Sequence, residues 1–255
     1  MITLLARVAL FIFSCAILVA VAAPFGTKLP GKWPEVVIGT IAAVGGLALT
    51  ALFVRWEKIR MDDVGAAPDA RSPVRFVIGF AGGLFLVAVW ALISAAAGKM
   101  RWAWTPGVEL SSGAIALIGY VALSCREELA FRGYPLRRLQ SRFGIWPAQV
   151  MVAVAFALEH RIGGWFWSDA ILGAGVGSLL FGMTAIASRG LAVPIGLHAA
   201  WNFGQWALGM KGSAGLWKLE NGGEGATAIY VAVFVAATIA IALWHRVAAC
   251  PPTRR

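Results

Sequence analysis

Three short polar stretches interrupt the long apolar runs of this chain, and their side chains are of the kinds that hydrolyse peptide bonds. In chain order, these side chains are Glu127, Glu128, Arg132, His160, His198 and Asn202. Ionisable side chains inside apolar helices cost free energy in lipid, so each of them is a candidate for function. The chain has only three histidines, and two of them lie in these stretches.

Helical spacing gives the two adjacent glutamates different partners. Residues four positions apart lie on one face of a helix, whereas adjacent residues diverge by about 100°. Glu128 and Arg132 are therefore predicted to pair, and Glu127 is predicted to be free to act as a base. The same spacing places His198 and Asn202 on one face. Each pair taken alone is also a common structural contact, and it is the combination of three stretches that indicates a catalytic site.

These residue types predict hydrolysis by an activated water molecule, without a covalent intermediate. Glu127 would take a proton from the water, which then attacks a carbonyl carbon. An imidazole would orient that water or protonate the leaving amine. The Asn202 amide and an N–H of His198 would stabilise the oxyanion.

The composition requires that membrane-spanning helices position these side chains. Of the 255 residues, 60% are apolar and 13% are charged, whereas soluble domains carry about 25% charged residues. This composition excludes a disordered chain, a disulfide scaffold and an ordinary soluble enzyme. We predict an all-α polytopic bundle of about eight transmembrane helices, at residues 2–23, 36–54, 76–97, 112 to beyond 132, 146–159, 169–187, 191–210 and 226–244.

All of these helices are expected to form one integral membrane domain. Residues 1–110 would supply the N-terminal helices, residues 111–210 the catalytic core, and residues 211–255 the last helix and a cytoplasmic tail. Gly173 and Gly177 are small residues four positions apart, and they predict that the sixth helix packs closely at the centre of the bundle.

The positive charge of the chain indicates contact with lipid headgroups. Its net charge is +10. In a membrane protein such an excess collects in cytoplasmic loops and meets anionic lipid, so we expect membrane lipid and no nucleic acid as a partner. Lysine and arginine are more frequent on the side of the two termini, which predicts cytoplasmic termini and a site in the cytoplasmic half of the bundle. The composition, rich in alanine, glycine and arginine, favours a bacterial inner membrane.

The order and spacing of the polar motifs resemble those of the CPBP family. This family comprises the type II CaaX prenyl endopeptidases and the bacterial Abi proteins, including bacteriocin-immunity proteins. The resemblance covers residues 112–210 and rests on the motifs Glu127-Glu128-x-x-x-Arg132, Phe156-x-x-x-His160 and His198-x-x-x-Asn202. The chain departs from the family at Pro135, which would kink the helix after Gly133.

The resemblance implies an eight-span intramembrane protease of the glutamate type, acting on a membrane-tethered protein or peptide. The implied roles are water activation by Glu127, assistance by His160, oxyanion stabilisation by His198 and Asn202, and support by Glu128 and Arg132. Glu127, His160 and His198 are also possible zinc ligands. Because the implied mechanism needs no metal, we expect no obligatory cofactor.

Two other functions are open at this point. An Abi-type membrane protein would use the same fold for binding or as a scaffold, without turnover. A transporter would use the ionisable residues as a proton or ion relay, but the sequence has neither an evident inverted repeat nor paired broken helices. The presence of every residue type that the hydrolytic mechanism needs favours the protease.

Overall fold

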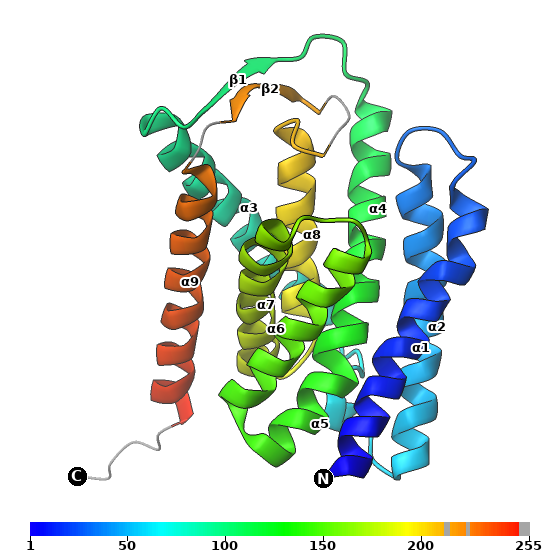
Figure 1. Ribbon diagram of the computed structural model, residues 1–255. Coiled ribbons are helices and arrows are strands. Elements are labelled where there is room, and N and C mark those ends of the chain that lie inside the picture. Colours follow the sequence, from blue (N-terminus) through cyan, green and yellow to red (C-terminus); the bar gives the residue numbers. More distant parts are fainter. Residues whose placement is uncertain (212–214, 223–224, 250–255) are drawn as a thin grey trace.

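The computed structural model describes residues 1–211, 215–222 and 225–249, and its regular structure is almost entirely helical (Figure 1). The α-helices are α1 (Ile2–Gly26), α2 (Trp33–Glu57), α3 (Ser72–Ala96), α4 (Leu110–Glu128), α5 (Tyr134–Phe143), α6 (Ile145–Ile162), α7 (Val176–Ser188), α8 (Ala192–Ala207) and α9 (Ala226–Ala249). π-Helical segments at Leu129–Gly133 and Asp169–Gly175 precede α5 and α7, and a short 3₁₀ helix covers Asp62–Val64. The two strands are β1 (Met100–Trp104) and β2 (Trp217–Gly222). The predicted all-α bundle is confirmed, and each predicted span contains a helix.

Five helical stretches of the described chain are long and apolar enough to cross a membrane. They are α1, α2, α3, the stretch Asp169–Ser188 and residues 226–246 of α9. In the stretch that contains α7, 61% of the residues in the most apolar 18-residue window are buried, compared with 17–28% in the other four. α7 is therefore a central helix, as its small residues predict. The other predicted spans, α4, α6 and α8, have only 19, 18 and 16 residues and carry the polar stretches.

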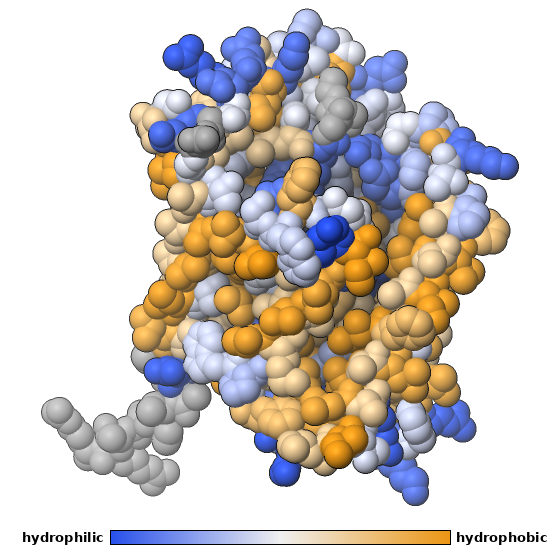
Figure 2. Space-filling model, viewed as in Figure 1, coloured by the Kyte–Doolittle hydropathy of each residue, from blue (hydrophilic) through white to orange (hydrophobic). Residues whose placement is uncertain are grey.

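The helices run between two distinct ends of the bundle (Figure 1). The N-terminus, α5 and the last turns of α9 lie at one end, here called the terminus end. At the opposite end, here called the sheet end, β1 pairs antiparallel with β2, which joins the α3–α4 and α8–α9 connections. Hydrophobic side chains cover the middle of the face shown in Figure 2, and hydrophilic side chains gather at both ends, as a bilayer requires. Assignment of the terminus end to the cytoplasm stays a prediction from the charge distribution.

Glycines bring the backbones of α3 and α8 into direct contact. A Cβ atom at Gly83 would meet the Leu197 carbonyl oxygen, and one at Gly196 would meet the Phe76 carbonyl oxygen. Small residues allow such close approach between membrane helices. The contact fixes α8, and with it the residues that α8 contributes to the site, against α3.

Replacing Gly83 by alanine is expected to destabilise the protein by about 1–3 kcal/mol, because overpacking a tight contact forces the backbones apart. Gly82→Ala is the matched control on the same helix, since a Cβ atom at Gly82 would meet no heavy atom within 4 Å. Equilibrium unfolding in mixed detergent micelles measures both variants against the wild type. Equal stability of the two variants would contradict the close α3–α8 contact.

An ion cluster at the terminus end ties α5 to the first two helices. The Glu57 carboxylate lies 3.1 Å from Arg7 Nη1 and 2.6 Å from Arg138 Nε, and its side chain is 2% exposed. The Tyr134 hydroxyl donates a hydrogen bond of 2.8 Å to Glu57 Oε1. Because Tyr134 begins α5, the cluster anchors the chain immediately after the first polar motif.

Candidate active site

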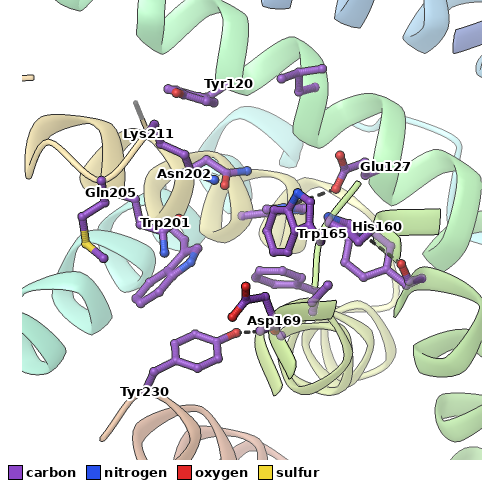
Figure 3. A pocket seen from close by; sticks show the side chains of 18 of the residues that line it. Tyr120, Glu127, His160, Trp165, Asp169, Trp201, Asn202, Gln205, Lys211 and Tyr230 are labelled. Carbon is purple, nitrogen blue, oxygen red and sulfur yellow. Dashed lines mark hydrogen bonds and ion pairs between the residues drawn. The ribbon is translucent and has the colours of Figure 1, made fainter. Parts of the chain in front are cut away.

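Three helices bring the predicted site residues to one cavity of about 820 Å³ (Figure 3). The side chains that line it include Glu127 from α4, His160 from α6, and His198 and Asn202 from α8. Glu128 and Arg132 lie behind the cavity wall and are fully buried. Residues from motifs far apart in the sequence are thus neighbours in the fold.

The cavity extends from these side chains toward the sheet end of the bundle. Its lining there includes Met210 and Lys211, which follow α8, and Ala226 at the start of α9. The termini lie at the opposite end (Figure 1). The cavity therefore leads away from the end that the charge distribution assigns to the cytoplasm, a direction that the sequence does not indicate.

A π-helical segment follows the two glutamates directly. Residues Leu129–Gly133 form this wider turn, and all five are buried. A regular α-helix restarts at Tyr134, with Pro135 in its first turn, where a missing backbone N–H costs nothing. The chain therefore changes from π-helical to α-helical geometry after Gly133, just before this proline. π-Helical turns occur frequently at functional sites, and this one carries Arg132.

Glu128 forms the predicted pair with Arg132 and also holds His198. Arg132 Nη1 lies 3.4 Å from Glu128 Oε1, and both side chains are fully buried. The same oxygen lies 2.8 Å from His198 Nδ1. A carboxylate only accepts hydrogen bonds, so Nδ1 carries the proton in this contact. Phe181 stacks on the imidazole with ring centroids 4.2 Å apart, which fixes the orientation of the His198 ring.

Glu127 was predicted to be free of partners, but the preceding residue, Arg126, holds its carboxylate. Arg126 Nη2 donates a hydrogen bond of 2.7 Å to Glu127 Oε1, and Arg126 Nη1 donates one of 2.6 Å to Glu159 Oε1. Glu159 is thus paired with an arginine, and its side chain is 24% exposed. Adjacent residues diverge on a helix, but the arginine side chain is long enough to reach across that angle.

The second oxygen of Glu127 faces His198. Glu127 Oε2 lies 3.5 Å from His198 Nε2. Since Nδ1 already carries a proton toward Glu128, Nε2 is the ring atom that can receive or give a further one. A contact between Nε2 and a carboxylate oxygen is attractive when a proton lies between them. A proton on Nε2 would thus lie between the imidazole and the Glu127 carboxylate at the cavity wall.

His160 presents one nitrogen to the cavity and uses the other for its own helix. Its Nδ1 lies 2.9 Å from the Phe156 carbonyl oxygen, which only accepts, so Nδ1 is the donor. In the neutral ring, Nε2 is then an acceptor. The rings of Phe156 and Trp165 flank the imidazole, with centroids 4.5 and 4.7 Å away. Asn202 lines the same cavity.

The part of the cavity nearer the sheet end carries two further charges and an aromatic wall. Asp169 and Lys211 both line it (Figure 3). Burial lowers the pKa of Lys211 to about 8, and the charge of Glu127 opposes this shift. Trp201 and Tyr230 form the wall, with ring centroids 5.3 Å apart. Trp201 also packs in a buried hydrophobic cluster, against Trp90 and Phe234.

Arg126 and Lys211 are cavity residues that the sequence analysis did not single out. Arg126 lies inside the apolar run of the fourth predicted span, next to the two glutamates. The rule that marks ionisable residues in apolar helices as functional candidates applies to it as well. Lys211 gives no such signal, because it follows the end of a span.

Glu127, His160 and His198 are the possible zinc ligands of the sequence. Within residues 1–211, 215–222 and 225–249, no group of three or more His, Cys, Asp or Glu side chains is arranged to hold a metal ion. His198 Nδ1 is engaged by Glu128, and His160 Nδ1 by a backbone carbonyl. These contacts leave Nε2 of both rings as the nitrogen that can bind another group.

Comparison with known proteins gives a family match for the part of the chain that holds the site. No curated protein matches the chain. The family model described as Type II CAAX prenyl endopeptidase Rce1-like matches residues 109–204. These residues include α4, α6, α7 and nearly all of α8, and with them every predicted site residue. The resemblance to the type II CaaX prenyl endopeptidases, which the three motifs predict, is therefore confirmed for residues 109–204 of this membrane protein.

Proposed function

We propose that this protein is an intramembrane endopeptidase that cleaves a membrane-tethered protein or peptide with a water molecule activated by Glu127. The observation that carries the proposal is the cavity where Glu127, His160 and His198 meet, inside the segment that matches an endopeptidase family. Ionisable side chains within a membrane bundle mark functional sites. The cavity volume of about 820 Å³ falls within the range of about 300–1,000 Å³ of ligand sites.

Glu127 is the base of the proposed reaction. Its Oε1 accepts the hydrogen bond from Arg126, and its Oε2 faces the cavity and His198. Oε2 takes a proton from water, the hydroxide attacks the carbonyl carbon, and the same proton passes to the nitrogen of the leaving amine. His160 Nε2 accepts a hydrogen bond from the attacking water and so orients it.

Asn202 and His198 stabilise the oxyanion in this proposal. The Asn202 amide donates one hydrogen bond, and His198 Nε2 donates another when it carries a proton. Glu128 and Phe181 hold the imidazole in place for this role. Loss of one donor of this kind typically lowers kcat about 100- to 1,000-fold.

Cleavage of anchored reporter peptides by the purified protein in liposomes tests the proposed function. Two reporters share one peptide sequence, and one is anchored by a farnesylated cysteine and the other by an N-terminal acyl chain. We expect the wild type to cleave at least one reporter at a defined peptide bond, identified by mass spectrometry. Binding without cleavage of either reporter would contradict the protease and support the Abi-type binding protein.

No metal is required in the proposed reaction. Cleavage of the reporter is expected to persist after dialysis against EDTA, because Glu127 activates the water without a metal ion. Loss of activity on dialysis and its recovery with zinc would overturn this part of the proposal.

A further inference from the structure

We infer that Arg126 and Glu159 form a positioning pair, which aims the Glu127 carboxylate and sets its place relative to His160. This inference rests on the proposed function, since it concerns the orientation of the base in that reaction. It assigns a task to Glu159, which is not one of the site residues that the sequence predicts.

The guanidinium of Arg126 spans two carboxylates from two helices. Its Nη2 lies 2.7 Å from Glu127 Oε1 on α4, and its Nη1 lies 2.6 Å from Glu159 Oε1 on α6. The side chains of Arg126 and Glu127 are 11% and 12% exposed, and that of Glu159 is 24% exposed. Charge-assisted hydrogen bonds of this length are among the strongest in proteins, and partial burial limits their screening by salt.

The ion pair between Arg126 and Glu159 connects two helices that have their main contacts elsewhere. α4 packs chiefly against α2 and α8, whereas α6 packs chiefly against α5 and the π-helical segment Asp169–Gly175. Glu159 directly precedes His160 in the sequence. The Arg126–Glu159 bond therefore ties the end of α6 that carries His160 to the end of α4 that carries Glu127.

The hydrogen bond from Arg126 also determines which oxygen of Glu127 is available for the reaction. Arg126 engages Oε1, so Oε2 is the oxygen that faces His198 and the cavity. Without the arginine, the carboxylate would be free to rotate about its last side-chain torsion, which has broad minima. A loss of alignment of this kind lowers the rate of the chemical step more than it lowers substrate binding.

A double-mutant cycle on reporter cleavage tests the pair. Arg126→Gln is expected to lower kcat about 10- to 100-fold with KM unchanged, because a misplaced catalytic group costs up to about 100-fold. Glu159→Gln is expected to lower kcat less, and the double variant is expected to match Arg126→Gln alone, since Glu159 acts only through Arg126. Arg126→Lys is expected to have a higher kcat than Arg126→Gln. Lysine keeps the positive charge but lacks the planar guanidinium that donates to two carboxylates at once.

The controls separate this inference from the fold and from the proposed function. Arg161→Gln removes an exposed arginine from the same end of α6 and is expected to leave kcat and KM unchanged. Melting temperatures in detergent identify any variant that fails to fold, and if Arg126→Gln fails, Glu159→Gln and Arg126→Lys carry the test. Multiplicative effects of the two substitutions in the double variant, or an unchanged kcat for Arg126→Gln, would overturn the inference. A wild type that cleaves no reporter would instead overturn the proposed function.

Discussion

Replacing Glu127 by glutamine is expected to reduce reporter cleavage by about 100- to 10,000-fold, the usual contribution of general acid–base catalysis. The substitution removes the base and keeps the shape of the side chain. A glutamine oxygen can still accept the hydrogen bond from Arg126, which the glutamate accepts at 2.7 Å in the wild type. The variant is therefore expected to fold and to bind the reporter as the wild type does.

Single-turnover cleavage in liposomes, together with thermal unfolding in detergent, checks this expectation. Glu220→Gln, on the exposed strand β2, is the control for removing one negative charge, and it is expected to cleave at the wild-type rate. A Glu127→Gln variant that cleaves normally would exclude Glu127 as the base. The shared cavity would then need another function, with binding as the first candidate.

Replacing Arg132 by alanine is expected to destabilise the protein by about 3–5 kcal/mol, the cost of leaving a buried charge without its partner. Arg132 and Glu128 are both fully buried, with 3.4 Å between Nη1 and Oε1. The guanidinium also lies 4.3 Å from the centre of the Phe156 ring, so its loss removes packing as well as charge. Activity is expected to fall in parallel, because Glu128 orients His198.

Equilibrium unfolding in mixed micelles measures this loss. Arg142→Ala is the matched control, because Arg142 is exposed on α5 and its removal is expected to change stability by less than about 0.5 kcal/mol. If Arg132→Ala is as stable and as active as the control, the buried pair contributes neither to the fold nor to the site.

Relations within one helix are predictable from this sequence. The spacing of Glu128 and Arg132 predicts their ion pair, and the spacing of His160 and Phe156 predicts their contact, because helical periodicity sets which side chains share a face. The long apolar runs predict the helices themselves, since every backbone polar group in lipid must be bonded within its own segment. The order of the motifs is sufficient to indicate the family.

Relations between helices were decided by the tertiary structure. Periodicity leaves Glu127 without a partner and does not mark Glu159, yet Arg126 joins these residues of two helices. His198 lies between the two glutamates because α8 is seated against α3 at Gly83 and Gly196, a contact that depends on matching surfaces of both helices. A single helix determines the angle at which a side chain leaves it. The partner of that side chain depends on the rotation and depth of the neighbouring helix, which only the packing of the whole bundle determines.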